Sequence, residues 1–160
     1  MSRLDIDRIR TYLQDHDLSL FLTMDPQLGH HLTGWMPAIY RDWTVQEAPL
    51  IFVFGRDTEP FIVFRRPYLP PPAPADLGIT DIYPSGSLLD EKMDVLIAQL
   101  RERGFSGGRI GIEMNLVPIL AYERLRSAFP AAEFVDASAF SRTLIGSKTP
   151  DQIQCISHAL

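Results

Sequence analysis

Residues 109–136 read RIGIEMNLVPILAYERLRSAFPAAEFVD: a short β-rich run, a longer amphipathic run and a second β-rich run. The first run, 109–113, predicts a strand, and the proline at 118 suits the first turn of a helix over 118–129. Residues 133–136 predict the next strand. A strand, a helix and a strand in this order are typical of an α/β fold.

The same kinds of pattern continue on both sides of this stretch. They predict helices over 3–16, from Pro26 to about Gly34, from Ser87 to about Arg103, over 137–146 and from Pro150 onward, and strands over 18–23, 50–54, 61–64 and 79–84. The runs 50–54 and 61–64 flank GRDTEP, which predicts a hairpin. Ser87 and Asp90 have the spacing of a capping box. We therefore expect an α/β domain with a mixed sheet of about five to six strands and helices on both faces.

Composition excludes several classes of function. The chain has 160 residues, 46% hydrophobic and 22% charged, and a net charge of −5 without a block of Lys and Arg. This predicts one globular domain that binds neither nucleic acid nor a membrane. The N-terminus lacks the apolar core of a signal peptide, and no run reaches the length of a membrane span. Because there is a single cysteine, an intrachain disulfide is impossible, and we expect a cytoplasmic protein.

Catalytic motifs are not found in the sequence. His30 and His31 are adjacent, so on a helix they point about 100° apart and are not expected to chelate a metal together. No serine stands in a nucleophile elbow. Glu113 is the carboxylate to note, since it ends a predicted strand, although one acid does not make an acid–base pair. We predict no catalytic residue and no metal ligand in this chain.

One aromatic stretch is not explained by packing alone. Residues 34–43, GWMPAIYRDW, contain both tryptophans, Trp35 and Trp43, together with Tyr40 and Arg41. Trp, Tyr and Arg are the residues that anchor interfaces and ligand pockets. Two interpretations stand equally here: a contact site for a substrate or partner subunit, and a loop folded back onto the core.

Two further segments, one rich in proline and one at the C-terminus, predict how the chain is arranged outside the core elements. Five prolines between residues 67 and 74 predict an extended crossing, for which a surface loop is favoured over an SH3-type ligand. The final stretch, GSKTPDQIQCISHAL, predicts a linker and then a well-started helix with Ile153, Ile156 and Leu160 on one face. A helix this short is marginal alone, so that face is expected to pack on this domain, pair with a second copy or fray.

Three pieces of the sequence, in order, resemble the N-terminal domain of the creatinase/prolidase/aminopeptidase P family. They are RIRTYLQDHDLSLFLTMDPQLGHHLTGW (8–35), RIGIEMNLVPILAYERLRSAFPAAEFVDAS (109–138) and LIGSKTPDQIQCISHA (144–159). Leu28 and His31 stand where the family commonly has Asn and Tyr. The resemblance covers nearly the whole chain.

The resemblance implies a two-domain parent protein. Residues 1–146 would be the N-terminal domain, and 147–160 the linker and first turns of a pita-bread catalytic domain that holds two divalent metal ions (Mn, Co or Zn). Family members usually form dimers or tetramers, and in several the N-terminal domain of one subunit overhangs the active site of another. Tyr40 and Arg41 lie near the place where creatinase holds an aromatic and an arginine against the substrate carboxylate.

The leading hypothesis is therefore a non-catalytic N-terminal domain of an Xaa-Pro metallopeptidase that shapes access to the active site and mediates homodimerisation. Its expected partners are the pita-bread domain of the same protein and a second subunit. One alternative is a parent of creatinase-like or lyase-like chemistry with a non-peptide substrate. Another is a free-standing dimerisation or binding module.

Overall fold

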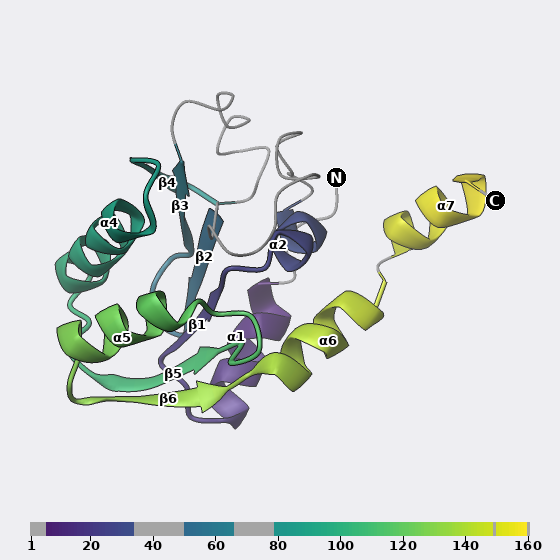
Figure 1. Ribbon diagram of the computed structural model, residues 1–160. Coiled ribbons are helices and arrows are strands. Elements are labelled where there is room, and N and C mark those ends of the chain that lie inside the picture. The colour runs from purple at the N-terminus through teal and green to yellow at the C-terminus, as the bar shows by residue number, and fades with distance from the viewer. Residues whose placement is uncertain (1–5, 34–49, 66–78, 149, 160) are drawn as a thin grey trace.

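The computed structural model of this protein describes residues 6–33, 50–65, 79–148 and 150–159 (Figure 1). Its elements, in chain order, are α1 (Ile6–Asp15), β1 (Leu20–Thr23), α2 (Pro26–Thr33), β2 (Leu50–Gly55), β3 (Phe61–Arg65), β4 (Asp81–Ser85), α4 (Leu89–Glu102), β5 (Gly108–Ile112), α5 (Ile119–Ala128), β6 (Ala132–Asp136), α6 (Ser138–Gly146) and α7 (Pro150–Ala159). Each lies where the sequence predicts an element of that type, within a few residues at the ends.

The strands form one six-stranded sheet in the order β4-β3-β2-β1-β5-β6. β2 is antiparallel to both β1 and β3, and its pairing with β3, from Leu50 with Phe64 to Val53 with Phe61, confirms the predicted hairpin. The other neighbouring pairs are parallel. All strands except β2 therefore run the same way, and their last residues meet at one edge, the carboxyl edge of the sheet.

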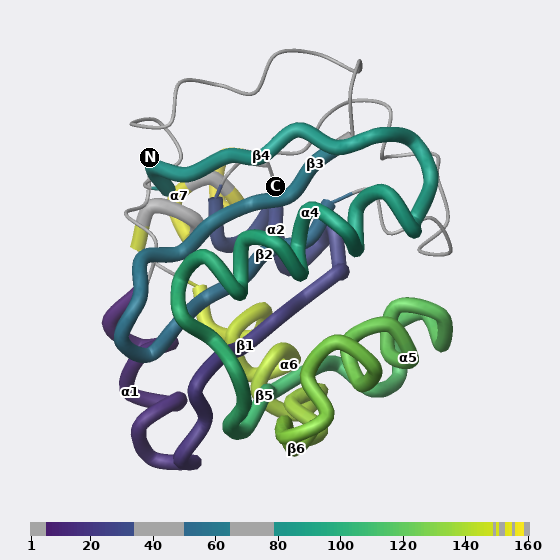
Figure 2. The backbone as a smooth tube through the Cα atoms, turned by 90° about the vertical axis from the view of Figure 1, so that its left-hand side faces the viewer, coloured from purple at the N-terminus to yellow at the C-terminus, as the bar shows by residue number. Residues whose placement is uncertain are grey.

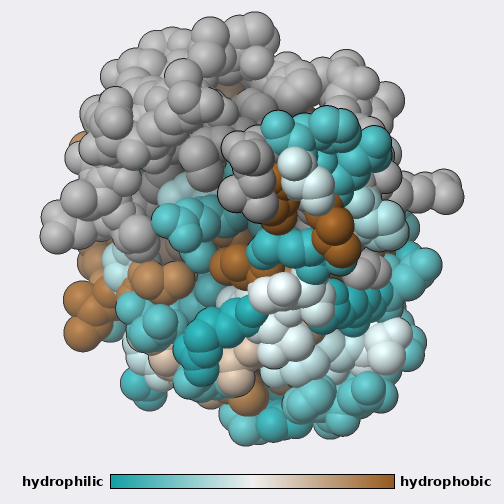
Figure 3. All heavy atoms as spheres, turned by 90° about the vertical axis from the view of Figure 1, so that its right-hand side faces the viewer, coloured by the Kyte–Doolittle hydropathy of each residue, from teal (hydrophilic) through white to brown (hydrophobic). Residues whose placement is uncertain are grey.

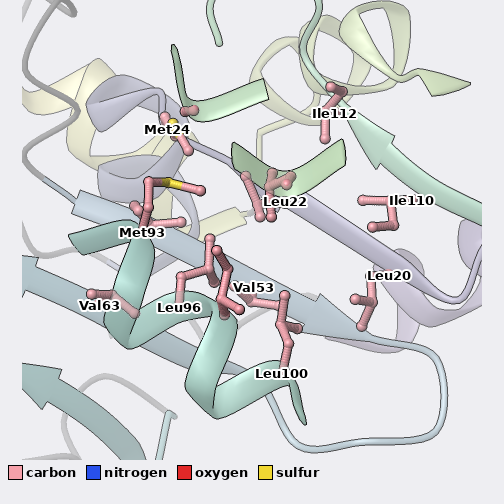
Figure 4. Close-up of a cluster of buried hydrophobic side chains, with 14 of the residues drawn as sticks. Leu20, Leu22, Met24, Val53, Val63, Met93, Leu96, Leu100, Ile110 and Ile112 are labelled. Carbon is pink, nitrogen blue, oxygen red and sulfur yellow. The ribbon is translucent and has the colours of Figure 1, made fainter. Parts of the chain in front are cut away.

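Helices cover both faces of this sheet, as predicted (Figures 1 and 2). One core cluster joins α1, α2 and α6 to alternate strand residues such as Phe21, Phe52 and Ile62. The other joins α4 and α5 to the intervening residues, among them Leu22 and Val53 (Figure 4). This alternation follows from the two-residue period of a strand, which sends successive side chains to opposite faces. The predicted mixed α/β architecture is confirmed.

Only half of the predicted capping box forms at the start of α4, and it lies one residue later than predicted. Leu88, not Ser87, precedes the helix in an extended conformation, and its N–H donates to Glu91 Oε2 at 2.9 Å. The carbonyl of Ser87 instead accepts a hydrogen bond from the buried Lys92 Nζ at 2.9 Å. Glu91 is the third residue of α4, so its side chain can reach back to the N–H of Leu88, the residue before the helix. The shift leaves an apolar leucine in the exposed capping position.

Candidate functional site at the carboxyl edge

The predicted site residues Trp35, Tyr40, Arg41 and Trp43 lie outside the described residues, as do the proline-rich residues 67–74. The structure does place the points from which segment 34–49 leaves and returns. It follows α2, which starts three residues after β1 ends. It precedes Leu50, the first residue of β2, which pairs with Phe64, next to the last residue of β3. The segment therefore rejoins the sheet at the carboxyl edge.

At this edge, Glu113 directly follows β5 and is only 4% exposed. Its carboxylate accepts a hydrogen bond from the buried Thr23 hydroxyl, at the end of β1. Thr23 Oγ1 in turn accepts a hydrogen bond from the N–H of Asp25 at 3.0 Å, and the Asp25 carboxylate caps α2 by accepting from the N–H of Gln27 at 2.8 Å. One chain of hydrogen bonds thus joins the ends of two parallel strands to the helix from which segment 34–49 departs.

The environment of Glu113 shifts its acidity. Burial raises the pKa of the carboxyl, because a low-dielectric site penalises the charged form, and the negative charges of Asp25 and Asp136 raise it further. Hydrogen bonds from the hydroxyls of Thr23 and Ser141 act in the opposite direction. The pKa remains above its ordinary value. A carboxyl so enclosed is suited to holding structure in place, since a substrate cannot reach it without displacing its neighbours.

A second hydrogen-bonded group, with one carboxylate, lies at the start of α6. The Asp136 carboxylate accepts from the N–H of Ser138 at 3.0 Å, and Ser138 Oγ lies 2.6 Å from Asp136 Oδ1 and 2.5 Å from Asn115 Oδ1. The bonds from Ser138 hold the pKa of Asp136 below its ordinary value. The ends of β5 and β6 are thereby tied to the start of α6. Together with the Glu113 network, this fixes three strand ends and two helix starts against one another.

Sequence reasoning identified Glu113 but missed Thr23, Asn115, Ser138 and Ser141. A signal was present, since Thr23, Asp136 and Ser138 each stand at or just after the end of a strand. Their pairing depends on strand order, however, and β1 lies beside β5 although 90 residues separate Thr23 from Glu113.

Neither a metal centre nor a membrane span is found in the part of the chain that the structure describes. Residues 6–33, 50–65, 79–148 and 150–159 contain no group of three or more His, Cys, Asp or Glu placed to hold a metal ion. His31 and Leu28 are the two departures from the family pattern. His31 lies near the end of α6, where burial and, to a smaller extent, the positive charge of Lys148 lower its pKa. Leu28 is fully buried in the core. No helix among the described residues is long and apolar enough to cross a bilayer.

The terminal helix α7 forms as predicted and lies beyond α6, away from the sheet (Figure 1). Ile153 and Ile156 are 54% and 47% exposed, so they do not pack back on the domain. Seen from the side of α6 and α7, brown apolar side chains are exposed among teal polar ones (Figure 3). Leu160 and the side chain of Gln152 lie outside the description.

The sequence matches the family described as the creatinase/prolidase N-terminal domain over residues 6–144. The chain therefore belongs to this family, as its sequence pattern predicts. A search of curated proteins gives no match.

Solved structures share the fold. The Creatinase/Prolidase N-terminal domain of an X-Pro dipeptidase from Streptococcus pyogenes superposes with a TM-score of 0.66 at 19% identity, covering 89% of this chain and 99% of that one. A proline dipeptidase from Streptococcus pneumoniae gives a TM-score of 0.62 at 20% identity, covering 92% and 100%. For a dipeptidase from Pyrococcus horikoshii OT3, the TM-score is 0.67 at 15% identity, and the match covers 96% of this chain but 40% of that protein.

Proposed function

We propose that this chain is the non-catalytic N-terminal domain of an Xaa-Pro metallopeptidase. The observation that carries the proposal is the family match over residues 6–144, together with neighbours named as proline or Xaa-Pro dipeptidases. The described residues offer no metal site that the two divalent ions of such an enzyme would fit. We therefore assign those ions to a catalytic domain that follows residue 160.

The proposed domain boundary lies between α6 and α7. α6 ends at Gly146 and α7 starts at Pro150, which leaves a short connection suited to a linker. The exposed Ile153 and Ile156 of α7 would be covered by the following domain. Residues 1–146 then form the N-terminal domain, and 147–160 form the linker and the first turns of its catalytic partner.

In this role the domain would narrow access to the active site, lend the loop of residues 35–43 to a neighbouring subunit, and mediate association of subunits in a cytoplasmic enzyme. A loop that enters an active site needs a rigid base, and the buried Thr23–Glu113 bond provides one close to the start of α2. Arg41 would bind the substrate carboxylate through two parallel hydrogen bonds, with Tyr40 beside it. Trp35 and Trp43 would contact substrate or a neighbouring subunit.

The test compares residues 1–160 with the same chain extended through its natural downstream coding sequence. We expect the longer protein to hydrolyse Xaa-Pro dipeptides with Mn²⁺ or Co²⁺ and residues 1–160 to show no turnover. Turnover by residues 1–160 would overturn the assignment. A longer protein that binds metal but acts only on non-peptide amidines or esters would replace the peptidase by the creatinase-like alternative.

The site residues are tested in the longer protein. Arg41→Ala should raise KM by about tenfold or more if a charge-assisted pair to the substrate is lost. Arg142→Ala, on the exposed side of α6, is the matched control and should leave KM unchanged. Equal effects of the two variants would remove Arg41 from the site.

A further inference from the structure

A small pocket lies at the edge of the sheet opposite Glu113, where the parallel strands begin. It has a volume of about 150 Å³ and is formed by the start of β1, the turn that joins β2 to β3, and the end of α4. We refer to it as the amino-edge pocket. A cavity of this volume holds a ring of about six atoms, so its ligand would be a small molecule.

The interior of the amino-edge pocket is mainly apolar. Leu20 of β1, Phe61 of β3 and Leu100 of α4 line it and are buried members of one core cluster, against which the half-buried Phe105 also packs. Figure 4 labels Leu20 and Leu100 on the strand and the helix that form two of the walls. Because covering these side chains removes apolar surface from water, the pocket favours a ligand with a small apolar body.

Main-chain hydrogen bonds hold the walls of the pocket in place. Gly104 follows α4 with a φ of 80°, a conformation that favours glycine, and the N–H of Phe105 donates to the carbonyl of Leu100 at 2.9 Å. On the β1 side, the N–H of Ser19 donates to the carbonyl of Arg109 at 2.8 Å. Since these bonds lie within the chain itself, a ligand would not have to order the site in order to bind.

Polar groups of both charges line the same pocket. Ser19 and Thr58 contribute hydroxyl groups, Arg103 a guanidinium and Asp57 a carboxylate. The side chain of Arg103 is 18% exposed and that of Asp57 is 78% exposed. The positive group therefore lies deeper in the site, and the negative group lies at its mouth.

The ion pairs that these two residues make within the chain leave each of them able to bind a ligand. The hydrogen bonds from Arg103 to Asp81 and to Tyr83 both come from Nη2, so neither of them uses Nη1. Asp57 accepts from Arg56 Nε through Oδ2, and that bond does not use Oδ1. A guanidinium has five N–H donors and a carboxylate about four acceptor sites, so one ion pair saturates neither group.

We propose that the amino-edge pocket binds a free amino acid with a small apolar side chain. The carboxylate of the amino acid would accept hydrogen bonds from Arg103 and from the hydroxyls of Ser19 and Thr58. Its ammonium would lie beside Asp57 at the mouth, and its side chain would pack on the apolar walls. A ligand with a single charge would leave one of the two charged groups unmatched. The pocket would bind this ligand whether or not the parent protein is a peptidase.

A titration of isotope-labelled residues 1–160 with L-proline, followed by nuclear magnetic resonance, tests the proposal. L-Proline has a small apolar ring and both charges, and it is the amino acid that Xaa-Pro hydrolysis would release. We expect saturable shifts in the amide signals of Ser19, Thr58 and Gly104. The dissociation constant should be roughly 0.1–10 mM, because a ligand of about eight heavy atoms makes few contacts.

Three related compounds each lack one feature of proline. Glycine lacks the apolar ring, pyrrolidine lacks the carboxylate, and cyclopentanecarboxylate lacks the ammonium. Loss of the ring or of the carboxylate should weaken binding about tenfold or more, because the first removes buried methylenes and the second removes charge-assisted hydrogen bonds. Loss of the ammonium, which pairs with an exposed group, should weaken it about twofold to fivefold.

Asp57→Asn should weaken the binding of proline by about twofold to fivefold and leave that of cyclopentanecarboxylate unchanged. Asp17→Asn is the matched control, because Asp17 also pairs with Arg56, has a side chain that is 81% exposed and does not line the pocket. Residue 17 has a φ of 50°, a left-handed conformation that asparagine also adopts, so the control should fold.

The proposal would be overturned by the absence of saturable shifts up to about 50 mM proline, by shifts centred away from the pocket, or by equal effects of Asp57→Asn and Asp17→Asn. Cyclopentanecarboxylate that binds as tightly as proline would overturn the amino acid in favour of a simple carboxylate. Binding is measured on residues 1–160 and peptidase turnover on the longer protein, so the failure of one proposal leaves the other standing.

Discussion

The hydroxyl of Thr23, at the end of β1, donates a hydrogen bond to the carboxylate of Glu113, which follows the end of β5. Both groups are buried, and the bond crosses between two parallel strands that are neighbours in the sheet. Thr23 also accepts a hydrogen bond from the N–H of Asp25, just before α2, and Glu113 is also hydrogen-bonded to Ser141 of α6. The Thr23–Glu113 bond therefore connects the start of α2 to α6. Substitutions of Thr23 or Glu113 should therefore change the free energy of unfolding.

Thr23→Val removes the hydroxyl while keeping the shape of the side chain. Glu113 would lose a donor in a buried site, so we expect a loss of about 1–3 kcal/mol in the free energy of unfolding, measured by urea titration. Thr11→Val is the control, since the Thr11 hydroxyl bonds the Asp7 carbonyl on the exposed side of α1. That change should cost less than about 0.5 kcal/mol. Equal losses of unfolding free energy in the two variants would show that the buried bond stabilises the fold no more than the exposed one does.

Glu113→Gln should change how stability depends on pH. The pKa of Glu113 is raised in the folded protein, chiefly by burial, so the folded state binds its proton more tightly than the unfolded chain does. Its contribution is fully present below the unfolded pKa and is lost as pH rises through the folded pKa. The wild type should therefore lose stability relative to Glu113→Gln as the pH rises from about 4 toward 7.

Urea titrations of both proteins across this pH range measure the difference. Glu123→Gln, on the exposed side of α5, gives the reference for removing a carboxyl group from the surface. A difference between wild type and Glu113→Gln that stays flat, or that grows in the opposite direction, would contradict the assigned shift.

Gly29→Ala should destabilise the packing of α2 on the sheet. A Cβ at this position would overlap the ring of Phe52 on β2, and both partners are buried. Forcing an extra methyl into a packed core costs about 1–3 kcal/mol, which a lower melting temperature would show. Gly146→Ala is the matched control, because no neighbouring atom lies within 4 Å of the place that the added methyl would occupy. It should be neutral or slightly stabilising.

Arg103→Lys should loosen the edge strand β4. The guanidinium of Arg103 donates to Asp81 Oδ2 at 2.5 Å and to the Tyr83 hydroxyl at 3.0 Å, and it lies 4.7 Å from the centre of the Phe61 ring. An ammonium lacks both the planar fork and the stacking surface, so we expect a loss of about 1–2 kcal/mol in unfolding free energy.

Faster amide hydrogen exchange in β4 would accompany that loss and would locate it. Arg56→Lys is the control, as Arg56 pairs with Asp17 and Asp57 at the surface. If both variants exchange as the wild type does in β4, Arg103 does not anchor the strand.

The helices, strands and hairpin were predictable because their signals are local. The β-rich runs in Leu50–Gly55 and Phe61–Arg65, and the proline at the start of α2, indicate which conformation each segment prefers. The capping residue was misplaced by one position because the sequence pattern favours serine there, whereas in the structure Glu91 accepts a hydrogen bond from the N–H of Leu88. The predicted contact residues Trp35, Tyr40, Arg41 and Trp43 stay a prediction.

The sequence alone determined the α/β class, the family and the terminal helix, because periodicity, caps and motif spacing are properties of neighbouring residues. Only the tertiary structure decided that Thr23 meets Glu113 and that Phe61 and Leu100 line one pocket. Both relationships follow from the order of the strands and the side on which each helix packs. Strand order and helix placement depend on burying both faces of the whole sheet together, so they cannot be read from any single segment.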